Sequence, residues 1–278
     1  MTDRVGRADI HVHSLASDGL SSVAAILERA DELELDVLAI TDHERVDAAH
    51  AARQMALARG MRVQVIVGEE ISTRGGHLLG LFIERRVRPW QSLRASIAQV
   101  HEQGGLAIVA HPLMPYPLCA SARSIRRLLA DADPRYRPDA IEAFNPTTAA
   151  SRWGQRVPAF AAELGMPVTG ASDAHRAADI GAALTTFPGT SADELRAAIL
   201  AGTTGWQGDA YTLRHQVHTF RGQLAKNALA VRDEVRGKLR RDGTGRDLGY
   251  PGGRRRPARL DESAVAAESG PRGAERSR

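Results

Sequence analysis

The chain has 278 residues, a formal net charge of +4 and a single cysteine, Cys119. Its apolar runs span five residues or fewer, whereas a membrane helix needs about 20, so the transmembrane class is excluded. The N-terminus lacks the apolar core of about 7 to 15 residues that a secretory signal requires, so we expect a cytoplasmic protein without a membrane partner. One cysteine forms neither an intramolecular disulfide nor a thiolate cluster, so any bound metal must have nitrogen and oxygen ligands.

The net charge is distributed unevenly along the chain. Residues 1–210 carry 21 arginines and no lysine against 25 acidic residues, a net charge of −4. Residues 211–278 carry 16 basic and 8 acidic residues, a net charge of +8. The isoelectric point near 9.7 is therefore set by the C-terminal segment and says little about the folded part.

Seven aliphatic or β-branched runs alternate with segments rich in Ala, Leu, Arg and Glu. The predicted strands are Ala8–His13, Asp36–Thr41, Arg62–Gly68, His77–Ile83, Leu106–Ala110, Asp139–Phe144 and Met166–Gly170. The predicted helices are Ser22–Leu35, Val46–Arg59, Trp90–Gln103, Ser121–Ala130, Ala149–Leu164 and Ala192–Ala201. This alternation predicts an α/β fold of parallel strands, either an open doubly wound sheet or a barrel.

The pattern changes after residue 205. An apolar stripe from Leu213 to Leu239 repeats at spacings of three and four residues, which predicts one face of a long helix. That face packs either on the body of the protein or on a partner helix, and the oligomeric state stays open. Later residues have too little apolar surface to offset the entropy of ordering, which predicts disorder. We therefore divide the chain into a domain at 1–210, an amphipathic helix at 211–240 and a basic tail at 241–278.

Side chains that can bind metal follow the ends of the predicted strands. The first strand ends in His11 and His13, and because side chains alternate along a strand, both imidazoles point to the same side. In a parallel α/β fold the carboxyl ends of the strands open on one face, where such folds place their sites. The cluster expected there holds six histidines and three carboxylates: His11, His13, Asp18, His43, Glu70, His77, His111, Asp173 and His175.

The size of this cluster predicts bound metal. Burying so many titratable groups without a cation is costly, because each charge loses hydration. Nine ligands exceed the roughly four to six positions of one first-row divalent ion, so we expect two or three ions. Imidazole and carboxylate ligands without thiolate favour Zn²⁺, Mn²⁺ or Fe²⁺ over Mg²⁺ and Ca²⁺.

The order of these motifs resembles the PHP (polymerase and histidinol phosphatase) domain superfamily. The motifs lie within about residues 8–205 and read His11-Val12-His13, Ser17-Asp18-Gly19, Thr41-Asp42-His43, Gly68-Glu69-Glu70, His111-Pro112 and Ser172-Asp173-Ala174-His175. The resemblance implies a distorted (β/α)7 barrel with a trinuclear metal site at the C-terminal face of the strands.

The resemblance also implies how the nine side chains divide among three metals. The first metal would be held by His11, His13, Glu70 and Asp173, the second by Glu70, His77 and His111, and the third by Asp18, His43 and His175. The family pattern Gly-x-Glu gives the bridging role to Glu70 and leaves Glu69 as its neighbour. Glu70, Asp173 and His175 are accordingly the expected catalytic residues.

Within the superfamily the chain is similar to small stand-alone phosphoesterases, which include nucleoside 3′,5′-bisphosphate phosphatases with 5′-3′ exonuclease activity on short RNA or DNA. The resemblance implies a hydrolase of phosphoric esters, with nucleotide or short oligonucleotide phosphates as the favoured substrates. In this reaction a metal-bound hydroxide attacks phosphorus in line while another metal supports the leaving oxygen. Longer relatives carry an insertion between His77 and His111, where this chain has only about 30 residues.

Weaker candidates for substrate binding lie in the loops expected at the same face. A guanidinium group can form paired hydrogen bonds with a phosphate, and a side-chain amide can donate one. The candidates are Arg45, Arg74, Asn145, Arg152 and Arg176. Asp42, next to His43, is expected to orient a metal ligand by accepting a hydrogen bond. The +8 charge of residues 211–278 is compatible with nonspecific contact with nucleic acid.

Two other functions stay open at this point. Amidohydrolase-type C–N hydrolysis also uses a His-x-His strand at a barrel mouth, but it usually needs a carboxylated lysine, and residues 1–210 contain no lysine. A non-catalytic accessory module is the second alternative, because PHP domains attached to bacterial DNA polymerases can lose ligands and become structural. All nine ligand positions are present here, which argues against such a loss.

Overall fold

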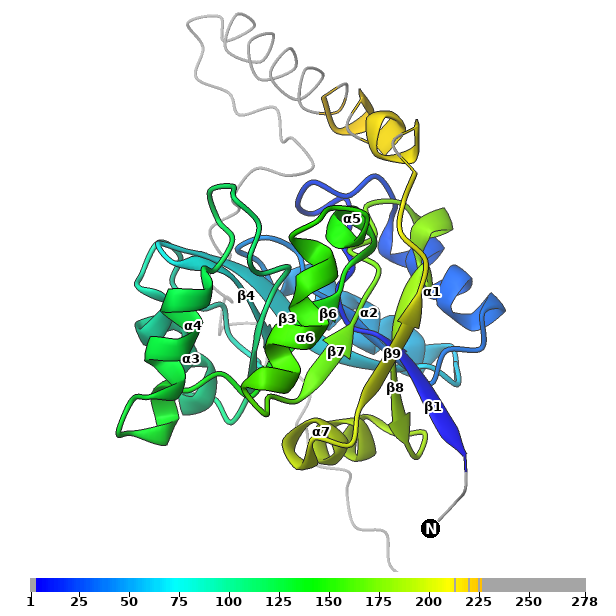
Figure 1. Cartoon of the computed structure of the whole chain (residues 1–278). Helices are drawn as coiled ribbons and strands as arrows, with labels where there is room; N and C mark the ends of the chain where they lie inside the picture. The colour runs from blue at the N-terminus through cyan, green and yellow to red at the C-terminus, as the bar shows by residue number, and fades with distance from the viewer. Residues whose placement is uncertain (1–3, 213, 220, 225, 227–278) are drawn as a thin grey trace, which may run out of the picture. The chain divides into compact units, whose positions relative to one another are not determined.

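A computed structural model describes residues 4–212, 214–219, 221–224 and 226 (Figure 1). The predicted tail at 241–278 and residues 227–240 of the predicted amphipathic helix lie outside the described residues. Residues 214–219 and 221–224 are helical, in agreement with the apolar stripe of the sequence. Among the described residues, no helix is long and apolar enough to cross a membrane.

The described residues form nine strands in one sheet. Their bounds are β1 Val5–Asp9, β2 Val37–Ile40, β3 Gln64–Thr73, β4 Gly76–Leu81, β5 Leu106–Val109, β6 Ala140–Phe144, β7 Val168–Gly170, β8 Ala183–Pro188 and β9 Gly205–Gly208. Their order across the sheet is β7-β6-β5-β4-β3-β2-β1-β8-β9. Each predicted strand overlaps one of β1 to β7, whereas β8 and β9 are not among the predicted strands.

The predicted run of parallel strands is wrong at β4. Strands β1 to β3 are parallel to one another, as are β5 to β7, but β4 runs antiparallel to both β3 and β5. Thr73 pairs with Gly76 across a two-residue turn, which leaves no room for the crossover that parallel neighbours require. Gly76 has a φ of +132°, and a Cβ there would lie 2.5 Å from the backbone nitrogen of Ala120. Only glycine fits this hairpin.

Helices cover the outside of the sheet (Figure 1). The α-helices are α1 Val23–Glu32, α2 Asp47–Ala58, α3 Leu93–Glu102, α4 Ala122–Leu129, α5 Pro146–Ala149, α6 Val157–Glu163 and α7 Ala192–Ala201, and the 3₁₀ helices are η1 Pro134–Tyr136, η2 Gly154–Arg156 and η3 Ala177–Asp179. The predicted helix Ala149–Leu164 is interrupted between α5 and α6 by a turn at Gly154, where a Cβ would lie 2.2 Å from the Thr148 carbonyl oxygen. The close approach at this turn requires glycine.

Helix starts follow the serines of the sequence. Ser22, Ser92, Ser121 and Ser191 cap α1, α3, α4 and α7, and each side chain accepts a hydrogen bond from a backbone N–H of the first turn. Ser191 also forms a capping box with Glu194. These caps fix where the helices begin, and thereby the lengths of the loops that lead into them.

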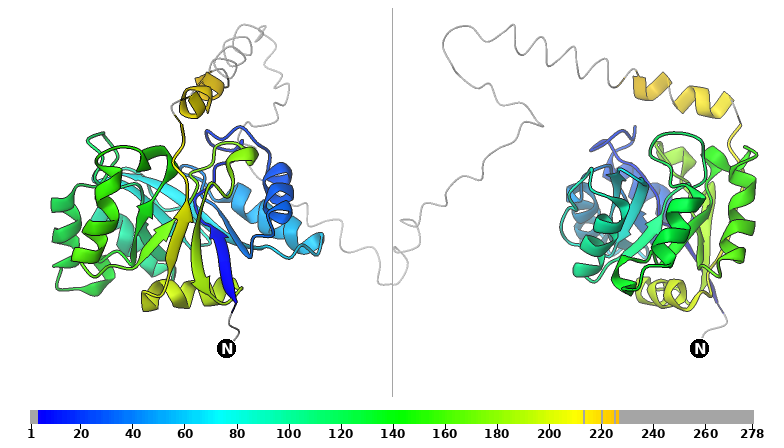
Figure 2. Two further views of the ribbon diagram at one scale, coloured as in Figure 1. Left: turned by 45° about the vertical axis from the view of Figure 1, so that its right-hand side comes forward. Right: turned by 60° about the vertical axis from the view of Figure 1, so that its left-hand side comes forward.

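The sheet curls until strands from its two ends meet. The Thr185 hydroxyl of β8 donates to the Gly170 carbonyl oxygen of β7 at 2.8 Å and accepts from the Gly170 N–H at 3.1 Å. The rings of Phe144 on β6 and Trp206 on β9 stack with centroids 4.5 Å apart. Inward-facing residues of the strands form one buried cluster with three residues of α7, which lies across one end of the barrel (Figures 1 and 2). The sheet is therefore a nearly closed, barrel-like one.

Candidate metal centre

All nine residues of the predicted cluster lie together at one end of the barrel. Each of them belongs to at least one group of three side chains whose ligand atoms lie within 4.8 Å of one another. They come from the segments that follow strands β1, β2, β5 and β7 and from the β3–β4 hairpin: His11, His13, Asp18, His43, Glu70, His77, His111, Asp173 and His175. The barrel brings together residues that are up to 164 positions apart.

Glu70 lies at the centre of the cluster and is 2% exposed. Its Oε2 lies 3.2 Å from Nε2 of both His11 and His13. Its Oε1 lies 2.7 Å from His77 Nδ1 and 3.0 Å from His111 Nε2. The two oxygens of one carboxylate therefore face different imidazoles, which is the arrangement that a bridge between two cations requires.

Asp18 gathers the ligand atoms on another side of the cluster. Its Oδ2 lies 3.0 Å from His175 Nε2, and its Oδ1 lies 3.5 Å from His13 Nδ1. His43 Nε2 lies between the two carboxylates, 3.9 Å from Asp18 Oδ1 and 3.4 Å from Glu70 Oε2. The ligand groups thus share members and form one continuous cluster.

Two residues of the cluster have a backbone conformation that favours glycine. Asp173 has a φ of +52° and His111 a φ of +26°. Such a conformation costs about 1–3 kcal/mol for a residue with a side chain and persists where the surrounding structure enforces it. It places Asp173 Oδ1 3.3 Å from His13 Nε2 and 3.5 Å from His11 Nε2. Backbone strain here directs ligand atoms inward.

The outer nitrogens of two histidines are occupied by acceptors. His11 Nδ1 lies 2.9 Å from Glu142 Oε1, and His175 Nδ1 lies 3.0 Å from the carbonyl oxygen of Asp173. Because a carbonyl or carboxylate oxygen only accepts, Nδ1 carries the proton in each ring. With a metal bound, Nε2 of each ring would present its lone pair to the ion, and the proton on Nδ1 fixes that tautomer.

Glu142 on β6 is a functional residue that the sequence analysis missed. It is 1% exposed, and its Oε2 accepts from the His111 backbone N–H at 2.7 Å and from Asn145 Nδ2 at 3.1 Å. Asn145 Nδ2 also lies 3.2 Å from Asp173 Oδ2. Both side chains therefore position the cluster. A lone acidic residue within the apolar run Ala140–Phe144 was the available signal.

Asp42 fixes the loop that carries Asp18. Its Oδ1 accepts from the Ser14 backbone N–H at 2.7 Å and from the Ser17 hydroxyl, and its Oδ2 accepts from the Ser14 hydroxyl at 2.5 Å. Asp42 is thus an acceptor, as predicted, but its hydrogen bonds go to the loop around Asp18 and not directly to a metal ligand.

The charges of the cluster are coupled. Burial lowers the pKa of His13, but the nearby carboxylates of Asp173 and Glu70 outweigh it and raise that pKa to about 10. Burial raises the pKa of Glu70, but the positive charges of the neighbouring histidines, His43 and His77 first, hold it well below its usual range. A proton on His13 thus balances the neighbouring carboxylates, and a cation would compete with it.

The donor atoms fit divalent metal ions. His11 Nε2 and both ring nitrogens of His13 are buried and have no hydrogen-bond partner within the described part of the chain. A Glu70 oxygen lies 3.2 Å from each Nε2 without hydrogen-bond geometry. A cation between such a nitrogen and oxygen would satisfy both atoms. Imidazole and carboxylate donors are those of Zn²⁺, Mn²⁺ and Fe²⁺ sites.

Glu69 points away from the cluster, as expected for a neighbour on an extended strand. Its Oε2 accepts from the Val87 backbone N–H at 2.7 Å, and the side chain is fully buried. Burial raises the pKa of this carboxyl group to about 8, and the charge of Glu44 adds to the increase. The two adjacent glutamates therefore have different environments and different ionisation.

Three of the arginines predicted to bind substrate have contacts outside the nine residues. Arg45 pairs with Asp47, at 2.6 Å between Nη2 and Oδ2. Arg176 forms two hydrogen bonds with Asp179, at 2.9 and 2.7 Å. Arg152 lies over a neighbouring tryptophan ring, 4.2 Å from its centroid. Arg45 and Arg176 have acidic partners within the described structure, so a substrate phosphate would have to compete for them.

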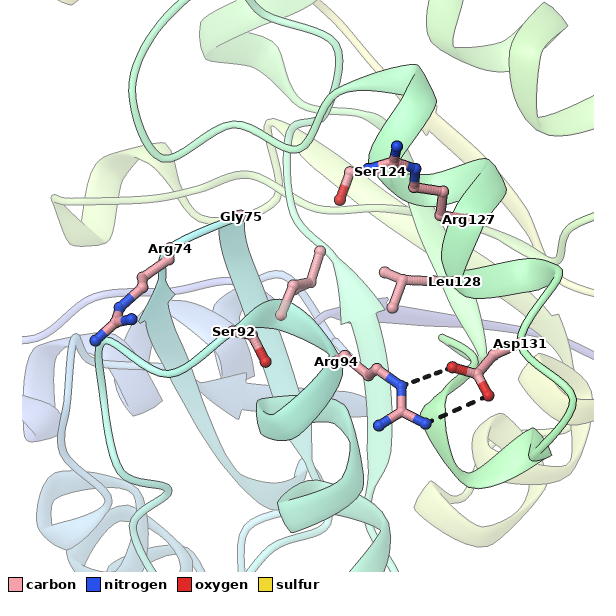
Figure 3. Close-up of a pocket in the computed structure, with 9 residues that line it drawn as sticks. Arg74, Gly75, Ser92, Arg94, Ser124, Arg127, Leu128 and Asp131 are labelled. Carbon is pink, nitrogen blue, oxygen red and sulfur yellow. Dashed lines mark hydrogen bonds and ion pairs between the residues drawn. The ribbon is translucent and has the colours of Figure 1, made fainter.

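Arg74 lines a separate cavity of about 350 Å³ between α3 and α4 (Figure 3). Arg94 and Arg127 line the same cavity, and Arg94 pairs with Asp131 at 2.6 Å between Nε and Oδ2. None of the nine clustered residues lines it. Arg74 therefore lies on the hairpin that carries Glu70 but serves a different surface.

Comparison with known families gives two matches. The family described as PHP domain matches residues 9–124, and the family described as PHP-associated matches residues 152–204. Together these segments contain all nine clustered residues. Glu142 itself lies between the two matched segments.

The chain is also similar to individual proteins. An uncharacterized protein of Methanocaldococcus jannaschii is 30% identical over 150 residues, which are 50% of this chain and 81% of that protein. The 5′-3′ exoribonuclease Rnm of Salmonella typhimurium is 40% identical over 80 residues, only 27% of either protein. A Bacteroides vulgatus two-domain protein containing a predicted PHP-like metal-dependent phosphoesterase superposes with a TM-score of 0.62 at 17% identity, covering 80% of this chain and 70% of that one.

Proposed function

We propose that this chain, which belongs to the PHP domain family, hydrolyses phosphate esters at a centre of two or three divalent metal ions. The observation that carries the proposal is the cluster of six imidazoles and three carboxylates around Glu70. Phosphate esters resist hydrolysis because their negative charge repels nucleophiles, and several adjacent cations remove that barrier. A cluster that can hold more than one ion fits this chemistry.

The nine residues would divide into three ligand sets, two of which share Glu70. One ion would be held by His11, His13, Glu70 and Asp173, a second by Glu70, His77 and His111, and a third by Asp18, His43 and His175. Mn²⁺, Zn²⁺ and Fe²⁺ are the candidates from the donor atoms. Such ions, when bound, lower the pKa of a coordinated water toward about 7 and neutralise phosphoryl oxygens.

The protein's own residues orient the reaction. In the hydrolysis, the oxygen of water forms a bond to phosphorus, the bond from phosphorus to the alcohol oxygen breaks, and the proton lost by water ends on the alcohol. Asp173 and His175 line the cavity that opens on the cluster, so the ester would bind from their side. Glu142 and Asn145 hold His11, His111 and Asp173 in place during the reaction.

Nucleotide or short oligonucleotide phosphates are the favoured substrates. Support comes from the exoribonuclease named above, whose similarity to this chain covers about a quarter of its length. The same comparison favours removal of terminal nucleotides over cleavage within a chain. Contact of residues 211–278 with nucleic acid would agree with their positive charge.

A phosphate-release screen tests the proposal. Purified protein would be incubated with nucleoside 5′-monophosphates, nucleoside 3′,5′-bisphosphates, short 5′-phosphorylated oligonucleotides and sugar phosphates, with Mn²⁺, Zn²⁺ or Fe²⁺. We expect metal-dependent hydrolysis of at least one substrate, and its loss in His11→Ala. Absence of hydrolysis in all combinations, with metal bound and the protein folded, would contradict the proposal.

A further inference from the structure

A cavity of about 390 Å³ opens on the metal centre beside Asp173 and His175. Its opposite wall consists of residues that follow the last strand of the barrel, among them His215, Gln216 and Val217. This segment lies beyond residue 210, where the sequence analysis placed the end of the catalytic domain. The catalytic cavity therefore includes part of the predicted amphipathic helix.

Hydrogen bonds attach the segment 211–226 to the barrel near its beginning. The Tyr211 hydroxyl lies 3.1 Å from the Ser172 carbonyl oxygen, next to Asp173. Gln216 Nε2 donates to the Thr147 carbonyl oxygen at 3.0 Å. The start of the segment is thus fixed to the loops that follow β6 and β7.

The other end of the segment is attached to the loop that carries Asp18. Lys226 Nζ donates to the carbonyl oxygens of Leu15, Ser17 and Gly19 at 3.2, 2.6 and 2.7 Å. Gln223 Nε2 lies 3.0 Å from Asp18 Oδ2. The helical residues between these contacts are consequently held across the mouth of the metal centre.

Away from the metal centre, the described cavity wall offers no cationic side chain, and its one carboxylate already has a basic partner. No arginine or lysine is among the described residues that line it. Asp179 lines it, but this carboxylate pairs with Arg176 and lies 3.3 Å from His215 Nε2. The remaining wall offers the amides of Gln216 and Gln223 and the apolar side chain of Val217. Such a lining suits a neutral group with hydroxyl or amide functions, and does not suit a second phosphate.

We propose that the cavity-lining residues Tyr211, His215, Gln216, Val217, Thr219 and Gln223 form the binding site for the alcohol part of the substrate, and that this part is an uncharged group the size of one nucleoside. The phosphate would lie toward Asp173 and His175, and the alcohol against the helix. A volume of about 390 Å³ is at the lower end of the range for small-molecule sites, about 300–1,000 Å³, and suits one nucleoside. The inference rests on the proposed function and narrows its substrate class.

Filling the cavity tests the inference. Val217 lines the cavity and is 48% exposed, so Val217→Trp adds volume there without entering the core. Leu224→Trp is the matched control, because Leu224 lies on the same helical segment, is 51% exposed and does not line the cavity. The probes are 5′-AMP and ethyl phosphate, two monoesters that differ only in their alcohol. Circular dichroism and metal analysis of each variant would verify folding and metal content.

We expect Val217→Trp to lower kcat/KM for 5′-AMP by about tenfold or more while ethyl phosphate stays within about twofold, as expected when only the alcohol loses its site. Leu224→Trp should change neither. Equal losses on both esters, or none on 5′-AMP, would overturn the inference and leave the proposed function intact. If the wild type cleaves neither ester, calorimetric binding of 5′-AMP to the Mn²⁺-supplemented protein decides. Binding that Val217→Trp abolishes supports the cavity, whereas absent or unaffected binding overturns it.

Discussion

Two adjacent glutamates on β3 have opposite surroundings, which makes them a sharp test at the scale of single residues. Glu70 faces imidazoles with both of its oxygens, whereas Glu69 binds a backbone N–H on the other side of the strand. Glu70→Gln keeps the size but removes the charge, and we expect kcat/KM to fall by orders of magnitude. Glu69→Gln should stay within about tenfold, or about 1.4 kcal/mol of transition-state stabilisation.

The physical reason for the mild effect at Glu69 is its ionisation. Burial raises the pKa of Glu69 to about 8, so this carboxyl group is largely neutral at pH 7 and an amide replaces it with little change in charge. Measurements of kcat/KM at saturating Mn²⁺ would compare the two variants. A larger loss in Glu69→Gln than in Glu70→Gln would reverse the assignment of the bridging residue.

Glu142 supports the cluster through hydrogen bonds alone, and its removal should weaken metal binding. Its two oxygens hold His11 Nδ1 and the His111 backbone N–H. Loss of such a supporting group typically lowers metal affinity by about 10–100-fold, which we expect for Glu142→Gln in a calorimetric titration with Mn²⁺. Asp36→Asn is the control, because Asp36 is a buried carboxylate that pairs with Arg62 away from the cluster. Equal affinity in wild type and Glu142→Gln would contradict a supporting role.

Secondary-structure elements were predictable where a periodic apolar pattern was long enough. The strands that precede the ligands are apolar runs such as Leu106–Val109, whose pattern is legible without tertiary context. β9 reads Gly-Trp-Gln-Gly, which has no apolar alternation. Its strand conformation depends on antiparallel pairing with β8, which its own sequence does not reveal. The direction of β4 likewise depends on a two-residue turn. Strand propensity does not encode direction.

His101 at the end of α3 links this helix to β6 and predicts a pH-dependent stability. Its Nδ1 lies 2.8 Å from the Arg135 carbonyl oxygen and its Nε2 lies 2.8 Å from Asp139 Oδ2. Two acceptors require two N–H donors, which only the imidazolium provides. The Asp139 hydrogen bond accordingly raises the pKa of His101 above 6.5. Since the folded pKa is the higher one, the stabilisation is fully present below the unfolded pKa and is lost as pH rises through the folded value.

His101→Asn should therefore lose stability mainly at low pH. We expect its unfolding free energy to be about 1 kcal/mol below that of the wild type near pH 5.5, and the difference to shrink toward pH 9. Urea unfolding of both proteins across this range measures it, and the comparison cancels the titration of the distant metal cluster. A difference that grows with pH would show that His101 is neutral in the folded protein.

At the scale of the whole molecule, the metal cluster was predictable because the carboxyl ends of neighbouring parallel strands lie at the same face of the sheet. Residues as distant as His11 and His175 could be grouped from the ends of their strands alone. The arginines could not, because a long side chain on a loop binds the nearest acid. Arg176 finds Asp179 three positions away, a partner that strand order does not reveal. The cavity wall formed by residues after Asp209 could not be predicted either, because helix periodicity does not say where a helix packs.

The cluster also predicts that metal contributes to the stability of the folded protein. Ligands drawn from strands across the barrel hold a metal only when the chain is folded, so binding stabilises the native state by mass action. A free metal concentration of 100 times the dissociation constant adds about 2.7 kcal/mol. For a domain of this size we expect the midpoint of thermal unfolding to rise by about 5–10 °C on adding Mn²⁺ to chelator-treated protein.

The comparison needs variants that separate the cluster from the rest of the fold. His11→Ala and His175→Ala belong to different ligand sets, and each should lose part of the increase and a different subset of the metals. His101→Asn, which lies outside the cluster, should keep the whole increase. Elemental analysis after metal-supplemented expression should give two or three transition-metal ions per chain. Fewer than one ion per chain, or an unfolding midpoint that metal leaves unchanged, would mean that proton-bearing imidazoles alone balance the three carboxylates.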